Sequence, residues 1–365
     1  MWRLRASAGK DPITGKYVYV SKTIHGGPRI ADQELAKLVV SAQTSAAPEL
    51  TLNSVIEAFL ALRERQGISA KTLDSYQTLW RNHISGRLGV QKIAKLRPGD
   101  LDHEYGVMAA QGVGVSTIEH VHRLISAALG QAVKWEYLIK NPASSASPPT
   151  AGRTVVTAPT VPELNAIIQS TGSAQMANMF ALLSLTGARR GEIVALRWSD
   201  FEFDFAGGIL AISKSVGYTA ASGIFVKSTK TNKIRRISAD ETTTAVIVSQ
   251  MDDLKRHVEL GFDLAPDPYL FPGDPGGFNP IHPDTPSKAF RRVVSKLGLP
   301  FHLHQLRHFA ATQLIAGGFD PITVASRLGH DASVLMARYA HLLEARDRAA
   351  SEYLGSLIEL PESSR

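Results

Sequence analysis

One stretch of the chain, residues 141–158, decides much of what the protein can fold into. It reads NPASSASPPTAGRTVVTA, is rich in Pro, Ser and Ala, and carries a single charge, Arg153. Proline interrupts helices and central strands, and small polar side chains bury little apolar surface. We therefore expect an extended linker here, which divides the 365-residue chain into separately folded units.

The composition removes several function classes. The chain has no cysteine, which excludes disulfides, thiolate metal sites and a cysteine nucleophile. No apolar run approaches the roughly 18–20 residues of a membrane span. The first residues, MWRLR, lack the apolar segment of a secretory signal. We therefore expect a cytoplasmic protein that has no membrane partner.

The charge balance points to a polyanionic partner. Lys and Arg number 40 against 33 Asp and Glu, which gives a formal net charge of +7 and a pI of about 9.5. A basic protein of this kind most simply binds nucleic acid.

Residues 1–44 are predicted to form a small β-plus-helix unit. Strand-like alternation at 2–6 and 16–20 flanks a turn at 11–15, and residues 30–40 are typical of an amphipathic helix. The small and polar residues from Ser41 onward indicate a linker, which we bound at 45–50. Because the first strand begins at residue 1 with no lead-in, the natural N-terminus could lie further upstream.

Residues 51–140 are predicted to be a helical domain. Apolar residues recur at helical spacing from Leu52 to Leu60, and Ser69 is a candidate N-cap of the next helix. Ser116 and Glu119 have the spacing of a capping box at the start of a long third helix.

Residues 159–365 form the largest predicted unit. Thr160 and Glu163 have capping-box spacing, and helical periodicity follows to residue 185. A strand-like interval covers about 209–237, and helices return from 240. The expected class is mainly α with small β elements, an α+β fold.

Histidines gather near the C-terminus, where residues 302–341 hold five of the 12. A metal site would need a ligand pattern such as HExxH or HxH with an aspartate, and neither pattern is present. Arg307, Arg327 and Arg338 are interleaved instead, which favours a phosphate over a metal ion. If a helix opens at His304, then His304, Arg307 and His308 share one face of it.

A second cationic segment, TGARRGE, covers residues 186–192. Its glycine ends a helix, and Arg189 and Glu192 are three residues apart. The carboxylate of Glu192 can therefore orient the guanidinium of Arg189.

Four segments now stand in a fixed order: TGARRGE at 186–192, KTNKIRRI at 230–237, HQLRH at 304–308 and LGH at 328–330, with Tyr339 nine residues after His330. This set resembles the tyrosine recombinases, and more narrowly the phage-type integrases. The resemblance implies three domains: an arm-type DNA-binding domain at 1–44, a core-binding domain at 51–140 and a catalytic domain at 159–365.

The resemblance also implies roles for individual residues. Tyr339 would be the nucleophile, and Lys230 the general acid, with Lys227 and Lys233 as alternatives to it. The other catalytic residues implied are Arg189, His304, Arg307 and His330. Glu192 and His308 would support them. In the N-terminal unit, DNA would be bound by Arg3, Arg5, Lys16 and Lys22.

The implied reaction cleaves and rejoins DNA through a 3′-phosphotyrosine intermediate, with no metal, ATP or other cofactor. The expected partners are double-stranded DNA with core-type and arm-type sites, three further copies in a homotetramer, a DNA-bending host factor and an excision factor. Strand relaxation of the type IB topoisomerase kind, a non-catalytic DNA-binding protein and a metal phosphodiesterase are the alternatives.

Overall fold

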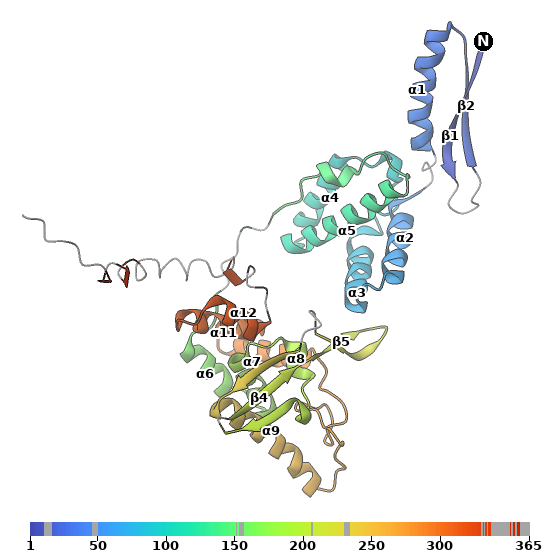
Figure 1. Cartoon of the computed structure of the whole chain (residues 1–365). Helices are drawn as coiled ribbons and strands as arrows, with labels where there is room; N and C mark the ends of the chain where they lie inside the picture. The colour runs from blue at the N-terminus through green and yellow to red at the C-terminus, as the bar shows by residue number, and fades with distance from the viewer. Residues whose placement is uncertain are drawn as a thin grey trace, which may run out of the picture. The chain divides into compact units, whose positions relative to one another are not determined.

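The computed structural model describes residues 1–10, 17–45, 50–150, 152, 157–205, 207–229 and 234–329, with 331, 333, 335–336, 351, 353–354 and 356–357. The chain divides into two compact units, Met1–Thr154 and Val155–Arg365, which are described separately (Figure 1). Helices dominate, and all strand pairs are antiparallel in the described residues, which confirms the expected α+β class. None of the described helices is long and apolar enough to cross a membrane.

The N-terminal part of the first unit is a hairpin with one helix. Its elements are β1 (Trp2–Lys10), β2 (Tyr17–Ile24) and α1 (Pro28–Ser45). Leu4 and Ala6 are buried with Ala31 and Leu38 of α1, so one face of the hairpin packs on the helix. The helix runs past Ser41, where the sequence indicated a linker, because SAQTS contains no helix-breaking residue and Pro48 comes only later.

The rest of the first unit is a helical bundle. Its elements are α2 (Leu52–Arg65), α3 (Ala70–Leu79), the π-turn η1 (Trp80–Ile84), the 3₁₀ turn η2 (Ile93–Lys95), α4 (Pro98–Ala110), α5 (Val115–Lys134) and the 3₁₀ turn η3 (Pro142–Ser145). The apolar faces of α2 and α5 are buried against one another, and Ser69 caps α3, as the periodicity predicted.

Two local predictions for this unit are wrong. Helix α5 begins at Val115 with Gly114 as its N-cap, so Ser116 lies inside the first turn and forms no capping box with Glu119. The start of the predicted linker is also folded. The Asn141 side chain donates to the Ser126 carbonyl and accepts from the Ala143 N–H, and Ala143 is buried in the bundle core.

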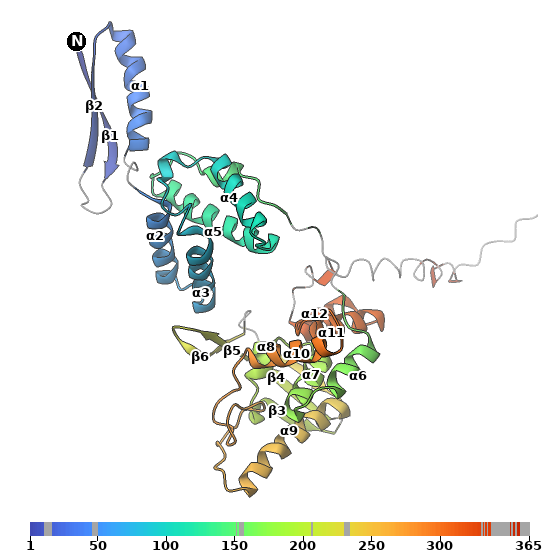
Figure 2. The same ribbon diagram turned by 180° about the vertical axis from the view of Figure 1, so that it is seen from behind.

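The second unit combines helices with two small sheets. Its elements are α6 (Val161–Gln169), α7 (Ala174–Thr186), α8 (Arg190–Val194), η4 (Trp198–Asp200), β3 (Phe201–Asp204), β4 (Gly207–Ile212), β5 (Lys214–Thr219), β6 (Gly223–Ser228), β7 (Arg235–Ala239), α9 (Glu241–Glu259), α10 (Thr285–Lys296), α11 (Gln305–Ala316) and α12 (Pro321–Leu328). One sheet has the order β3-β4-β7, and β5-β6 is a separate hairpin that projects from the unit in both views (Figure 2).

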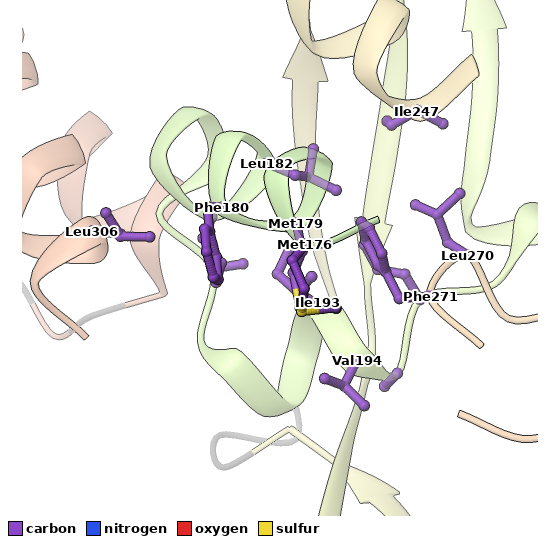
Figure 3. Packing of buried hydrophobic residues seen from close by; sticks show 14 of the residues in the cluster. Met176, Met179, Phe180, Leu182, Ile193, Val194, Ile247, Leu270, Phe271 and Leu306 are labelled. Atoms are coloured by element: carbon purple, nitrogen blue, oxygen red, sulfur yellow. The ribbon is translucent and has the colours of Figure 1, made fainter. Parts of the chain in front are cut away.

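Helix α7 is the centre of this unit. Figure 3 shows its residues Phe180 and Leu182 between Leu306 of α11 on one side and Ile247 of α9 on the other. The ring of Phe180 meets Phe290 of α10 edge to face, with centroids 5.3 Å apart. Since α7 and α11 are packed together in this core, the segments that follow α7 and open α11 are brought to the same end of the unit.

Candidate active site

The first cationic segment follows a glycine that ends α7. Gly187 has φ +61°, and the backbone then turns so that Arg189 is the N-cap of α8. Thr186 fixes this turn, because its hydroxyl donates to the Leu182 carbonyl and accepts from the Ala188 N–H. The predicted helix end at the glycine is confirmed.

Glu192 is the centre of a buried ion network. Its Oε1 lies 2.8 Å from Nη1 of Arg189, and its Oε2 lies 2.8 Å from Nη2 of Arg235 and 2.8 Å from the backbone N of Arg189. The side chain of Glu192 is 2% exposed, that of Arg235 9% and that of Arg189 30%. The expected orientation of Arg189 by Glu192 is therefore present in the structure.

The charge state of Glu192 follows from these contacts. Burial by itself would raise the pKa of the Glu192 carboxyl. The hydrogen bond and charge of Arg235, with the N–H and guanidinium of Arg189, outweigh burial and hold that pKa below its ordinary value. The carboxylate is therefore ionised at neutral pH.

The LGH segment reaches the same network through its glycine. Gly329 ends α12 with φ +66°, and its carbonyl accepts a hydrogen bond of 2.9 Å from Nη2 of Arg189. A Cβ built on Gly329 would lie 2.4 Å from Nη1 of Arg235. The sequence therefore needs glycine here both for the backbone conformation and for the approach of an arginine.

The HQLRH segment opens α11, as its spacing predicted. His304 is the N-cap, and its ring meets that of His308 edge to face at 5.0 Å. Arg307 is buried, and its Nη1 donates to the Gly187 carbonyl at 2.5 Å. This bond ties the second arginine to the turn that carries Arg189, 118 positions earlier in the chain.

A cavity of about 620 Å³ opens beside His304 and Arg307. Arg190 lies on its wall and is held there by Asp284 at 3.0 Å and Ser287 at 2.8 Å. The other charged residues of the wall belong to none of the four segments that the sequence motifs singled out. These are Asp284, Lys288 and Arg291. The i, i+3 spacing of Lys288 and Arg291 on α10 was the available signal.

Arg327 has a structural task in this arrangement. Its Nη1 donates to the Ser238 carbonyl and its Nη2 to the Leu185 carbonyl, at 3.1 and 3.3 Å. Burial lowers its pKa from the usual value, although an arginine stays charged. The cation thus joins α12 to β7 and α7.

Several predicted residues lie outside the described part of the chain: Lys16, Lys230, Lys233, His330, Arg338 and Tyr339. The alternative lysine, Lys227, is exposed on β6, with its Nζ 5.9 Å from the Phe225 ring centroid. No group of three or more metal-ligating side chains occurs among the described residues.

The N-terminal cations divide between two faces of the hairpin. Arg3 and Arg5 lie on the face away from α1, where the Arg5 guanidinium stacks 4.0 Å from the centroid of Tyr19. Lys22 lies opposite Leu4, on the helix side, and its Nζ is 2.7 Å from Glu34 of α1. The structure thus separates Lys22 from the two arginines with which the sequence grouped it.

Comparison with known proteins gives a consistent result. Residues 154–346 match the phage integrase family. The chain is 24% identical over 331 residues to a tyrosine recombinase XerC-like protein of Caldanaerobacter subterraneus subsp. tengcongensis, with 85% of this chain and 84% of the relative covered. A Tn1549 transposon integrase in complex with a circular intermediate DNA has a TM-score of 0.70 at 20% identity, over 84% of this chain and 99% of that one. A lambda integrase tetramer bound to a Holliday junction has a TM-score of 0.60 at 17% identity, over 89% and 90%.

The fold, the arginine-rich site and these similarities define the class of protein as recombinases that cleave and rejoin DNA. More narrowly, the chain belongs to the phage integrase family, whose match spans just over half of its length. It is therefore a site-specific DNA recombinase. The resemblance carried by the four segments is confirmed at this level.

Proposed function

We propose that Arg189 and Arg307 clamp the scissile phosphate of a DNA duplex and that Tyr339 attacks it. The observation that carries this proposal is the 2.5 Å bond from Arg307 to the Gly187 carbonyl, two residues before Arg189. It brings two permanently charged groups from distant segments to one end of the unit. Guanidinium forks bind non-bridging phosphate oxygens and strengthen as negative charge develops on them.

The proposed chemistry balances without a cofactor. The Tyr339 oxygen forms a bond to phosphorus, the bond from phosphorus to the 5′ oxygen breaks, and a 3′-phosphotyrosine remains. His304 accepts the phenol proton, and Lys230 donates a proton to the leaving 5′ oxygen. His330 donates a hydrogen bond to a phosphate oxygen, while Glu192 and His308 support the clamp. A 5′-hydroxyl from another duplex reverses the step and completes strand exchange.

A nicked suicide substrate that carries the attachment-site sequence tests this assignment. The wild-type chain should become covalently linked to the oligonucleotide at Tyr339, and Tyr339→Phe should bind the DNA without forming the link. Tyr353→Phe is a matched control, because Tyr353 is also a C-terminal tyrosine and is 65% exposed. Persistence of the link in Tyr339→Phe, or its loss in Tyr353→Phe alone, would contradict the proposal. Cleavage in excess chelator should equal cleavage without it.

The division of labour among domains is a further part of the proposal. Residues 1–44 bind arm-type sites through the exposed hairpin face that carries Arg3 and Arg5. Lys16, which lies outside the described residues, also contacts the DNA. Because Lys22 pairs with Glu34, it contributes less to DNA binding than Arg3 and Arg5 do. Residues 51–140 grip the core site, and 159–365 perform the chemistry.

Deletion of residues 1–44 tests this division. Arm-site binding should be lost in a gel-shift assay, while Tyr339-dependent cleavage of a core site should continue. Arg5→Gln should weaken arm-site binding more than Lys22→Gln does. Loss of all cleavage in the deleted chain would refute the division.

The proposed assembly is a homotetramer that holds two duplexes, in the cytoplasm of a bacterial host and on its nucleoid when active. The lambda integrase tetramer on a Holliday junction supports this stoichiometry. A host DNA-bending protein and an excision factor would set the direction of the reaction. Sedimentation of the chain on junction DNA measures the stoichiometry, and recombination of two marked duplexes with and without cell extract measures the need for such factors.

A further inference from the structure

Arg235 occupies a position that ordinarily holds an apolar side chain. Strand β7 alternates, with Arg235, Ile237 and Ala239 turned toward the core and Arg236 and Ser238 exposed. Removing a charge from water costs free energy unless a partner compensates it. An arginine on the inward face of the strand therefore requires a charged or hydrogen-bonding partner. Its partner is Glu192, which it contacts at 2.8 Å.

The contact divides the two oxygens of Glu192 between two arginines. Oε2 accepts from Arg235 and from the backbone N–H of Arg189, whereas Oε1 accepts from the Arg189 Nη1. Without Arg235, a carboxylate would tend to take Arg189 in a two-pronged fork, the geometry these groups prefer. That fork would withdraw further Arg189 donors from any other ligand.

Arg235 also limits where Arg189 can turn. The Nη2 of Arg189 donates to the Gly329 carbonyl at 2.9 Å, and Arg235 packs so closely on Gly329 that a Cβ there would collide with it. Arg235 therefore supports both groups that hold Arg189, namely the Glu192 carboxylate and the Gly329 backbone.

We infer that Arg235 is a positioning residue for the recombination reaction, which sets the Arg189 guanidinium through Glu192 and Gly329 so that its remaining donors face the phosphate. This inference rests on the proposed role of Arg189 in the clamp. It adds a residue that touches no substrate itself. A merely structural ion pair would stabilise the unit without favouring one kind of substrate over another.

The experiment compares two suicide substrates that differ only at the scissile group. One carries the ordinary phosphodiester, and the other a methylphosphonate, in which a methyl group replaces one charged oxygen. The neutral group needs no charge clamp, so a defect that acts through Arg189 should be large on the first substrate and small on the second. The quantity measured is the first-order rate constant of covalent-adduct formation at saturating protein, with the DNA Kd measured separately.

Arg235→Gln should slow adduct formation roughly 10- to 100-fold on the phosphodiester, the size of effect that a displaced catalytic group produces. On the methylphosphonate it should slow the reaction less than about threefold, since no clamp needs alignment there. Arg236→Gln is the matched control, because Arg236 is adjacent on β7, faces outward and pairs with Glu202 at 2.7 Å. It should leave both rates unchanged.

Arg189→Ala separates failure of this inference from failure of the proposed clamp. If Arg189→Ala shows no selective loss on the phosphodiester, the clamp itself is wrong. If Arg189→Ala shows it and Arg235→Gln is slowed equally on both substrates, or not slowed, Arg235 is not a positioning residue. Should Arg235→Gln fail to fold, Arg235→Lys keeps the charge without the fork, and the same selective loss or its absence decides the inference.

Discussion

Gly187 offers a sharp test of how the active-site turn is built. It ends α7 with φ +61°, a region where an L-residue costs about 1–2 kcal/mol. A Cβ at this position would lie 2.1 Å from Cδ2 of Leu328 and 3.2 Å from Cβ of Ala310. Leu328 is fully buried, so moving its side chain away would disturb its core neighbours, and Gly187→Ala should add an overpacking cost of about 1–3 kcal/mol.

Gly223→Ala isolates the backbone cost from the packing cost. Gly223, the first residue of β6 in the same unit, has φ +64°, and a Cβ there would meet nothing within 4 Å. Both variants therefore carry the free-energy cost of an alanine at positive φ, and only Gly187→Ala adds the steric clash with Leu328. In calorimetry of the full chain, the transition of residues 155–365 should fall roughly 5 °C further in Gly187→Ala than in Gly223→Ala.

The same substitution should also impair cleavage. The Gly187 carbonyl receives the Arg307 guanidinium, so a backbone shift at this turn displaces the second arginine of the proposed clamp. Adduct formation at a temperature where the protein stays folded should fall at least tenfold in Gly187→Ala and remain unchanged in Gly223→Ala. Equal melting and equal cleavage in the two variants would refute the packing argument.

Three other contacts give predictions of stability. In Glu192→Gln the acid sensitivity should decrease. The lowered folded pKa of Glu192 gives stability that is present above the unfolded value near 4.5 and is lost as pH falls through the lowered pKa. The urea midpoints of variant and wild type should therefore converge as the pH falls below 4.5, and parallel curves would contradict this. Asn53→Ala should cost about 1–3 kcal/mol in the helical bundle, because Asn53 accepts from Trp80 Nε1 and donates to the Ser85 carbonyl; an unchanged melting temperature would refute it. Asp274→Ala removes the acceptor of three backbone N–H groups in its loop, whose amides should then exchange with solvent measurably faster, and unchanged exchange would refute that role.

Much of the fold follows from local sequence signals. The apolar residues of α2 and α5 lie where helical spacing puts them, and the Thr160–Glu163 capping box is present. Such signals depend on residues within one or two helical turns, so they can be read from the sequence without knowledge of tertiary contacts. The Ser116–Glu119 box failed because Gly114 closes the first turn earlier, with its carbonyl accepting from the N–H of residues 117 and 118.

The candidate site was predictable only in part, because its members meet across long stretches of chain. Local spacing predicted the pairing of Arg189 with Glu192 and the helix that begins after His304. It did not select Arg235 over Arg236, although period-two alternation puts Arg235 on the same face as Ile237, which is buried. The decisive fact, that Arg235 of β7 reaches Glu192 of α8, depends on a tertiary contact between segments 43 positions apart in the chain.

The energetics of this network explain why distant segments must carry fixed residues. A buried ion network is weak evidence for stability, because well-packed apolar side chains of similar volume often serve as well or better. Glu192 and Arg235 are nevertheless buried together, and Gly329 lacks a side chain where Arg235 passes. The gain is orientation: one carboxylate and one carbonyl hold the Arg189 guanidinium by two separate nitrogens, which fixes both its position and its plane. A guanidinium that is fixed before the substrate binds does not have to reorganise when negative charge develops on the phosphate. A mobile arginine on the protein surface would have to be ordered first.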